Sequence, residues 1–325
     1  MSDRETVEFL AGVPLLEGYQ EAELQELARL MRRRTVRAGE TLWRQGDDPR
    51  ELLLVVDGTL SASLHVSGDR TVEIATLGRG DIVGDIALLD GGGHTMGVQV
   101  TETATVLTLG RSEFAALFAR PGPSAFRLRR RLAVLLTTRL RNQLRHLAAS
   151  LGGDAAPGAP ADDAARAFAE LEDCGPPDSR YVRRMATFHG FDSLALWGFL
   201  TSGRYARCPP GRTLVAEGAD STACYLTING AVEKVLARGD RRVRVGLAGP
   251  GKAFGYESLI DGVPSPSTAI TRERALLLVL PRAPFEHLFN GEDAVSRVFL
   301  DVIQRELVAT LRHTLRQHVR LAASL

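Results

Sequence analysis

The sequence has few cysteines, no excess of charge of either sign and no long apolar run. Its 325 residues include three cysteines, Cys174, Cys208 and Cys224, without the paired spacing of a metal site or a redox motif. An odd cysteine count fits a reducing compartment better than a disulfide framework. The 40 basic and 39 acidic residues leave no overall charge bias toward nucleic acids or membranes.

Targeting segments and catalytic motifs are also missing. The N-terminus lacks the basic start and unbroken apolar run of a signal peptide, and no stretch approaches the roughly 20 apolar residues of a membrane span. The sequence contains no H-E-x-x-H, no G-x-S-x-G and no paired carboxylates at helical spacing. These absences predict a soluble, cytoplasmic, bacterial protein that is neither an enzyme nor a metal-binding protein.

What the sequence does contain is an internal repeat. The stretch AGETLWRQG, residues 38–46, returns as PGRTLVAEG, residues 210–218, at an offset of 172, and Gly58 returns as Gly230 at the same offset. After a slip of one residue, VGDIALLDG (83–91) returns as FGYESLIDG (254–262), and EFAALF (113–118) as PFEHLF (284–289). A register held over so many residues indicates a tandem duplication.

Each repeat has the same pattern of predicted elements. A short amphipathic helix comes first, at 21–31 and at about 193–201, and short alternating strands separated by glycines follow. A long helix closes each repeat, at about 124–149 and 293–322. The strands are too short and too closely spaced for parallel βαβ units. We therefore expect an α+β protein with two antiparallel, jelly-roll-like β-rolls, each closed by a long C-terminal helix.

The composition also suggests the domain boundaries. Residues 1–150 are predicted to form the first domain with its closing helix, and residues 181–325 the second. Between them, residues 151–180 begin with LGGDAAPGAPADDA, which is rich in Pro, Gly and Ala and poor in bulky apolar residues. This segment is predicted to be a linker.

The order of roll, glycine-led loop and long closing helix resembles the cyclic-nucleotide-binding domain family, which includes the bacterial catabolite activator protein and the regulatory subunit of protein kinase A. The glycine-led loop resembles the family's phosphate-binding cassette. The positions that match the cassette are Gly84, Ala87, Leu88, Leu89 and Gly91 in the first repeat and Phe254, Gly255, Leu259, Gly262, Pro264 and Thr268 in the second. The resemblance implies a cyclic nucleotide as ligand: cyclic AMP, cyclic GMP or a cyclic dinucleotide.

Both cassettes depart from the family at the two positions that hold the ligand. Where the family has a glutamate for the ribose hydroxyl, the chain has Asp85 and Tyr256, and Glu257 follows one place later, where we expect it to face the other way. Where the family has an arginine for the phosphate, the chain has His94 and Ser265. The candidate ligand-binding residues are Gly84, Asp85, Ile86, Ala87, His94 and Thr95 in the first cassette and Gly255, Tyr256, Glu257, Ser258, Ser265 and Thr268 in the second.

Two interpretations of the cassettes remain open at this point. In one, the chain is a non-enzymatic regulatory sensor or adaptor that binds a cyclic nucleotide or another small anion by altered chemistry, with His94 as a pH-dependent cation. In the other, the cassettes have lost their ligand and survive as scaffold. In both, the output passes to an unidentified protein partner.

The first closing helix adds a third possibility. Between residues 125 and 147 it carries seven arginines and no acid, a pattern that suits a nucleic-acid or membrane surface or a solvated face. Its leucines, Leu132, Leu136, Leu140 and Leu144, form a seam of the coiled-coil kind. We expect this interface helix to pair with the second closing helix, giving a pseudo-symmetric monomer, or with another chain, giving a homodimer.

In the catabolite-activator branch the closing helix leads into a helix-turn-helix domain. Neither closing helix in this sequence is followed by such a pattern, so we expect no sequence-specific DNA binding.

Overall fold

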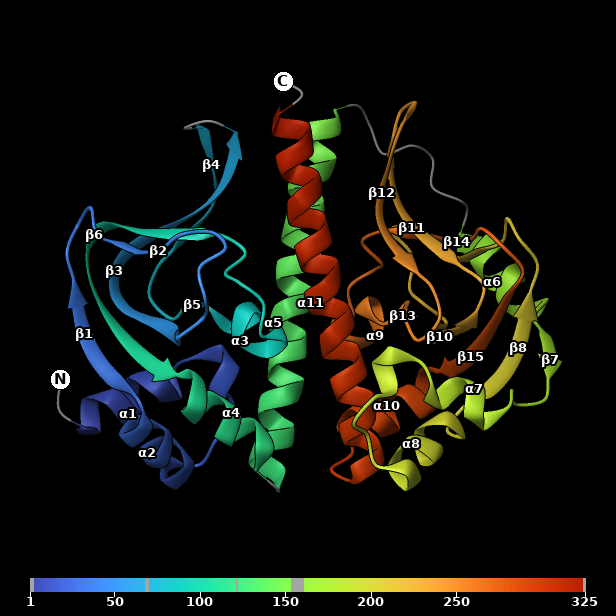
Figure 1. Ribbon diagram of the computed structural model, residues 1–325, viewed down its shortest axis with the longest axis horizontal. Coiled ribbons are helices and arrows are strands. Elements are labelled where there is room, and N and C mark those ends of the chain that lie inside the picture. The colour runs from blue at the N-terminus through green and yellow to red at the C-terminus, as the bar shows by residue number, and fades with distance from the viewer. Residues whose placement is uncertain (1–2, 68–69, 121, 153–160, 324–325) are drawn as a thin grey trace. The chain divides into compact units, whose positions relative to one another are not determined.

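The computed structural model describes residues 3–67, 70–120, 122–152 and 161–323 of the chain. Helices and antiparallel strands alternate as the two repeats predict (Figure 1). Backbone contacts divide the chain into two compact units, Met1–Leu132 with His318–Leu325 and Ala133–Gln317. No helix in the described ranges is long and apolar enough to cross a membrane.

The first repeat begins with two helices and a short 3-10 turn. Glu23 accepts a hydrogen bond from the backbone N–H of Gln20 at 2.7 Å, which fixes the start of the second helix. The strands β1–β6, called roll 1 here, form one antiparallel sheet in the order β1-β6-β3-β4, with β2 on β6 and β5 on β3. The elements are α1 (Asp3–Ala11), η1 (Pro14–Leu16), α2 (Glu21–Leu30), β1 (Arg32–Val36), β2 (Thr41–Trp43), β3 (Glu51–Ser67), β4 (Arg70–Leu77), β5 (Ile82–Val83), α3 (Asp85–Asp90), β6 (Gly97–Gly110), α4 (Arg111–Ala119) and α5 (Pro123–Leu151).

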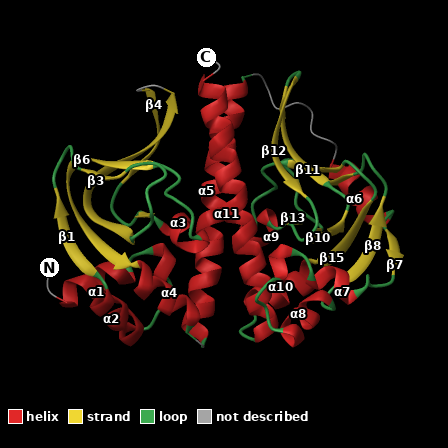
Figure 2. Cartoon of the chain, in the orientation of Figure 1, coloured by secondary structure: helices red, strands yellow, loops and turns green. Residues whose placement is uncertain are grey.

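The second repeat follows the same order with two sheets. Strands β7–β15 are called roll 2 (Figure 2). They lie in the orders β13-β10-β15-β8-β7 and β12-β11-β14-β9. The elements are α6 (Ala161–Ala169), β7 (Glu172–Cys174), α7 (Ser179–Arg183), η2 (Ala186–Phe188), α8 (Ser193–Leu200), β8 (Arg204–Cys208), β9 (Thr213–Val215), β10 (Ala223–Asn229), β11 (Val232–Arg238), β12 (Arg241–Ala248), β13 (Ala253–Phe254), α9 (Glu257–Asp261), β14 (Thr268–Thr271), β15 (Ala275–Pro281), α10 (Arg282–Asn290) and α11 (Ala294–Ala323).

The fold class predicted from the sequence is confirmed, and the two closing helices are α5 and α11. Each roll encloses its own apolar core: Trp43, Leu53, Val55 and Val106 are buried in roll 1, and Tyr225, Phe254 and Leu277 in roll 2. Inward-facing residues alternate along the strands, which is the period-2 pattern that indicated strands in the sequence.

Gly58 and Gly230 show that the duplication extends to backbone detail. Both have a left-handed φ, of 84° and 85°. A Cβ on Gly58 would lie 2.5 Å from the backbone of Thr103 and Ala104, and a Cβ on Gly230 would lie 2.5 Å from the carbonyl oxygen of Arg274. Only glycine fits both the conformation and the close approach, so the same residue recurs at the offset of 172.

The segment predicted as a linker is more ordered than expected. Residues 153–160 lie outside the described residues, but α6 and β7 follow within the predicted 151–180 range. Ala164, Ala167 and Leu171 are buried, and β7 pairs with β8 at the edge of roll 2. Ala167 of α6 belongs to the core cluster of roll 2, and Phe168 of the same helix packs against that cluster, which the composition alone did not indicate.

Candidate functional site

The two cassettes, residues 84–95 (cassette 1) and 255–268 (cassette 2), have the same backbone. Gly84 and Gly255 precede the short helices α3 and α9 with φ of 95° and 75°, and a Cβ on either would meet the backbone of the neighbouring strand at 2.7–2.9 Å. The later loops match as well. Gly46 donates its N–H to the carbonyl of His94 at 2.8 Å, and Gly218 donates to the carbonyl of Ser265 at 2.9 Å. The resemblance between the cassettes in the sequence therefore reflects a shared backbone.

In cassette 1 the candidate residues lie on and after α3. Asp85, Ile86 and Ala87 are the first three residues of α3, and all are buried. His94 is 5 % exposed, and Thr95 beside it is half-buried in the loop before β6. The structure brings His94 to the core-facing side of roll 1, where its ring stacks on Trp43 with centroids 4.1 Å apart and planes 10° apart.

Trp43 reaches the start of cassette 1 from β2. Its ring edge lies 3.6 Å from the position a Cβ on Gly84 would take, and the residue is 8 % exposed. The indole thus lies between the leading glycine and His94, which the resemblance places at the position of the family's arginine. The sequence analysis missed Trp43, although the repeat offset matches it with the smaller Val215 of the second repeat.

In cassette 2 the hydroxyl groups are bonded to the protein itself. The Ser258 hydroxyl accepts a hydrogen bond from the backbone N–H of Ser221 at 2.8 Å, and that of Thr268 accepts one from Glu217 at 3.1 Å. The Ser265 hydroxyl donates to the carbonyl of Ser267 at 3.0 Å. All three side chains are buried. Ser258 and Thr268 hold the cassette to the loop before β10, and Ser265 bonds within the cassette.

Cassette 2 also contains a buried ion pair that the sequence analysis did not foresee. Lys234 Nζ on β11 lies 2.6 Å from Glu257 Oε1 on the first turn of α9, and the two side chains are 6 % and 2 % exposed. Lys234 stands opposite Ala269 of the core in the β-ladder, so its side chain is on the inner face of roll 2. The expectation that Glu257 faces away is wrong, because its carboxylate meets this inward lysine.

Tyr256 completes this arrangement. It is fully buried, and Lys234 Nζ lies 5.5 Å from the centre of its ring. Burial raises the pKa of Tyr256 well above 10.0, and the negative charges of Glu257 and Glu306 raise it further. The phenol therefore stays neutral and occupies the position where the family has its ribose-binding carboxylate.

Helix α11 carries a second buried carboxylate next to this group. Glu306 is paired with Lys252 at 2.9 Å, and its side chain is 8 % exposed. Burial raises the pKa of Glu306, and the charges of Lys252 and Lys234 only partly oppose this effect. The folded protein therefore holds the Glu306 proton more tightly than the unfolded chain does.

This raised pKa gives a pH dependence with a defined sign. Stability contributed by Glu306 is expected to fall as pH rises from the unfolded value of 4.5 through the raised folded pKa. The free energy of unfolding by urea, measured at several pH values, should fall relative to that of Glu306→Gln over this window. Glu286→Gln, which alters a half-exposed pair, serves as the control, and curves of equal slope for wild type and Glu306→Gln would contradict the assignment.

The arginine-rich helix α5 is less exposed than its composition suggests. Arg129 and Arg141 are buried, at 5 % and 8 % exposure. Arg127 is paired with Glu23 at 2.7 Å, and Arg131 with Glu17 at 2.8 Å. The interpretation of these arginines as one solvated face is therefore wrong. The predicted interface leucines, Leu132, Leu136, Leu140 and Leu144, are all buried within the single chain.

Arg141 bonds directly to cassette 2. Its guanidinium donates to both carboxylate oxygens of Asp261 at 2.6 and 2.8 Å and to the carbonyls of Val263 and Pro264 at 2.7 and 2.5 Å. The residue belongs to the closing helix of the first repeat, but Ala133–Gln317 form one compact unit. Helix α5 therefore contributes a side chain to the second cassette.

Metal chemistry has no support in the described ranges, where no three His, Cys, Asp or Glu side chains gather into a possible metal site. Cys208 and Cys224 are buried, and burial raises the pKa of both thiols. Residues 246–253, which resemble part of a triphosphate loop, form the turn from β12 into β13.

Comparison with known proteins agrees with the repeat. The family model described as cyclic nucleotide-binding domain matches residues 33–121 and again 206–292, which together are more than half of the chain. The cyclic AMP receptor protein of Thermus thermophilus is 30 % identical over 132 residues, covering 41 % of this chain and 59 % of the relative. A cyclic nucleotide-gated potassium channel of Mesorhizobium japonicum is 31 % identical over 110 residues, covering 34 % of this chain and 29 % of the relative. The chain thus spans well under two thirds of the length of either relative.

Among solved structures, the regulatory domain of Toxoplasma gondii protein kinase A with cyclic AMP is similar, with a TM-score of 0.34 and 17 % identity. The match covers 88 % of this chain and 91 % of that one.

Proposed function

Because the chain belongs to the cyclic nucleotide-binding domain family, we propose that it is a non-enzymatic regulatory protein whose cassettes are held by its own side chains and that acts through protein contacts. The family occurs in regulatory proteins, and both copies of the domain are matched. The proposal concerns the cassette residues at which the two domains of this chain differ from the family.

The observation that carries the proposal is the Lys234–Glu257 pair in roll 2. A cyclic phosphate bound at α9 would need a cation, and Lys234 is an inward-facing cation beside the first turn of that helix. Its charge is already matched by Glu257. A phosphate that took Lys234 would leave a carboxylate of 2 % exposure without its partner, which costs several kcal/mol in a protein interior. Roll 2 is therefore proposed to be closed without a nucleotide.

Roll 1 supports the same conclusion by a different chemistry. The counterparts of Lys234 and Glu257 at the repeat offset are Ala62 and Ile86, both buried. The stacked side chains of Trp43 and His94 fill cassette 1 instead. Their counterparts in roll 2 are Val215 and Ser265. Each roll thus fills its cassette with a different pair of its own side chains.

The arginine-rich helix does not favour nucleic acid or membranes as the target. Four of its arginines are bonded to protein groups, namely Arg127, Arg129, Arg131 and Arg141. Electrostatic binding to phosphates needs cations that are free to replace counterions. The output is therefore proposed to pass through contacts with another protein.

The test is titration with cyclic AMP, cyclic GMP and cyclic dinucleotides at pH 6 and pH 8, followed by calorimetry and by tryptophan fluorescence. The chain has two tryptophans, and Trp197 is 46 % exposed. Trp197→Phe leaves Trp43 as the single reporter inside roll 1. We expect neither heat nor a change in Trp43 emission.

Micromolar binding would contradict the proposal and show that the chain is a nucleotide sensor. Loss of that binding in His94→Ala at pH 6 would place the ligand in cassette 1, with histidine as the cation. Binding that leaves Trp43 emission unchanged and responds to substitution of Lys234 would place it in cassette 2.

A further inference from the structure

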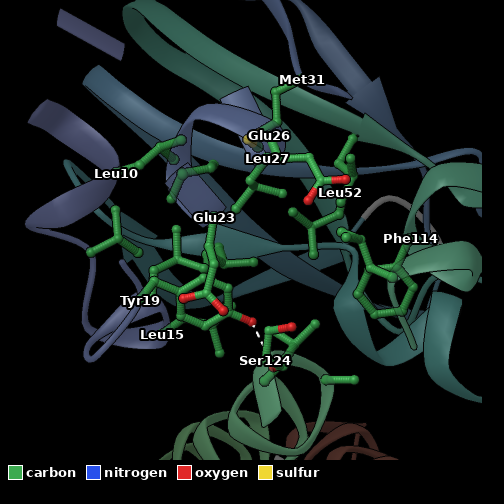
Figure 3. Close-up of a pocket in the computed structure, with 18 of the residues that line it drawn as sticks. Leu10, Leu15, Tyr19, Glu23, Glu26, Leu27, Met31, Leu52, Phe114 and Ser124 are labelled. Carbon is green, nitrogen blue, oxygen red and sulfur yellow. Dashed lines mark hydrogen bonds between the residues drawn. The ribbon is translucent and has the colours of Figure 1, made fainter. Parts of the chain in front are cut away.

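The first repeat contains an apolar cavity outside the cassettes. It has a volume of about 70 Å³ and lies between η1, α2, α4, the first turns of α5 and the outer side of β3 (Figure 3). Leu10, Leu27, Met31, Leu52 and Phe114 are among the side chains that enclose it. An engineered apolar cavity of about 150 Å³ binds benzene or xenon, so the smaller cavity of this repeat suits a molecule smaller than benzene.

The few polar groups at its edge are already bonded to protein partners. The Tyr19 hydroxyl donates to the carbonyl of Ser124 at 2.9 Å (Figure 3). Glu23 accepts from Arg127 at 2.7 Å, and Arg120 donates to Glu26 at 2.7 Å. A water inside would find apolar walls and few partners, and cavities of this kind stay dry and accept small apolar molecules.

The second repeat shows the same compartment filled. The repeat offset matches Leu16, Leu27 and Leu128 of the cavity wall with Phe188, Phe199 and Phe299. These phenylalanines pack in sequence, with Phe199 6.4 Å from Phe188 and 5.9 Å from Phe299 between ring centres, and all are buried. Phe285 closes the cluster 5.2 Å from Phe299, and its counterpart, Phe114, is retained in the first repeat.

At these three positions the first repeat has leucine where the second has a phenylalanine ring, and other wall positions differ in the opposite sense, with Met31 and Ile82 corresponding to Gly203 and Ala253. The first repeat has its cavity at the place where the helices before the roll meet the closing helix. We propose that this cavity of the first repeat is a binding site for a small uncharged apolar molecule, such as a short alkane or a xenon atom.

The chemistry of the walls sets the class of ligand. Burial of apolar ligand surface against aliphatic side chains contributes about 25 cal/mol per Å² to the binding free energy, and such walls have no group that binds a charge. A charged group inside would be desolvated without a counter-ion.

The site lies where it can act on α5. Tyr19 is bonded to Ser124 and Glu23 to Arg127, so the cavity wall is tied to the first turns of that helix. Leu128 of the same helix forms part of the wall. A bound molecule favours whichever position of these turns gives the better-packed cavity.

The experiment uses the full-length protein and xenon, which binds dry apolar cavities and whose ¹²⁹Xe line broadens on binding. Broadening is expected with wild type. Leu27→Phe, which places the side chain of the second repeat in the cavity, is expected to weaken probe affinity about tenfold or more. Leu128→Phe provides the same block from α5 if Leu27→Phe does not fold, as judged by circular dichroism.

Phe199→Leu supplies the reverse control, because it opens the corresponding compartment of the second repeat and should add a second site for the probe. Wild type that leaves the xenon line sharp would overturn the proposal. So would equal broadening in wild type and in a folded Leu27→Phe or Leu128→Phe variant, since the probe would then bind elsewhere. Neither result bears on the cassettes, which are tested by the nucleotide titration.

Discussion

Lys234→Met is expected to lower the free energy of unfolding by about 3–5 kcal/mol, the usual cost of removing one partner from a buried ion pair. Methionine keeps most of the volume of the lysine stem, so little of the loss comes from packing. What remains is Glu257, buried at 2 % exposure on the first turn of α9 with its cation removed. Urea unfolding of wild type and variant measures the effect.

A double-mutant cycle separates the pair from general damage to roll 2. Glu257→Met should destabilise to a similar extent, and Lys234→Met with Glu257→Met should recover most of the loss, because an apolar pair of similar size needs no desolvated charge. Arg282→Met, in a pair that is 50 % exposed on both sides, should change stability by less than about 1 kcal/mol. Single variants as stable as this control would show that the pair does not hold the cassette.

The same cycle bears on function. The double variant removes both the cation and the carboxylate from the inner face of roll 2 and leaves the cassette backbone unchanged. If roll 2 is a closed scaffold, the double variant should resemble wild type in every binding assay with a protein partner. Stability and output would then be separate properties of this domain.

The overall architecture could be predicted because it depends on patterns that repeat. Period-2 alternation gave the strands, the leucine steps of α5 gave a long helix, and matched glycines such as Gly58 and Gly230 gave the duplication. These signals come from short stretches of sequence, and each of them occurs twice because the chain is duplicated. Helix α6 was missed because its buried residues, Ala164 and Ala167, are alanines with little apolar surface, and the single Phe168 that packs beside them was not enough to distinguish the segment from a flexible linker.

The cassettes could be located from the sequence but not interpreted. The glycine-led turn is specified by backbone conformation, which Gly84 and Gly255 make visible. What fills each roll depends on residues from distant strands, Trp43 on β2 and Lys234 on β11. Lys234 lies between Val232 and Leu236 in the sequence of one strand, and alternation places all three side chains on the same face. This pattern could have predicted an inward-facing lysine.

Arg141 was counted as one of seven similar arginines because charge alone does not indicate which residue is buried. Position along the repeat offered a better signal. At the offset of 171, Arg141 corresponds to Arg312 and Asp261 to Asp90, so both residue types recur at matched positions. A basic residue that recurs at the same position in both closing helices is a more specific indication of a structural role than the overall charge of α5.

Arg141→Met is the second substitution with a large expected effect, also about 3–5 kcal/mol. The guanidinium serves four acceptors, two on Asp261 and the carbonyls of Val263 and Pro264, and Asp261 is 10 % exposed. Lysine cannot replace it, because a single ammonium lacks the planar fork that serves four oxygens at once. Arg141→Lys should therefore recover only part of the loss. Arg145→Met, an exposed position one turn later on α5, should stay within about 0.5 kcal/mol of wild type.

A second readout distinguishes a specific clamp from loss of stability alone. Arg141 holds the turn that follows α9, so its removal should raise hydrogen exchange at the amides of Gly262, Val263 and Ser265 more than at the strands of roll 2. Asp261→Asn should raise exchange at the same amides, and the two substitutions together should add little to either one. Because Arg141 lies on the closing helix of the first repeat, such non-additivity would establish that this helix and the second cassette move as one. Exchange raised evenly across roll 2 would instead make Arg141 a general packing residue, and the link between the first repeat and the second cassette would have to lie elsewhere.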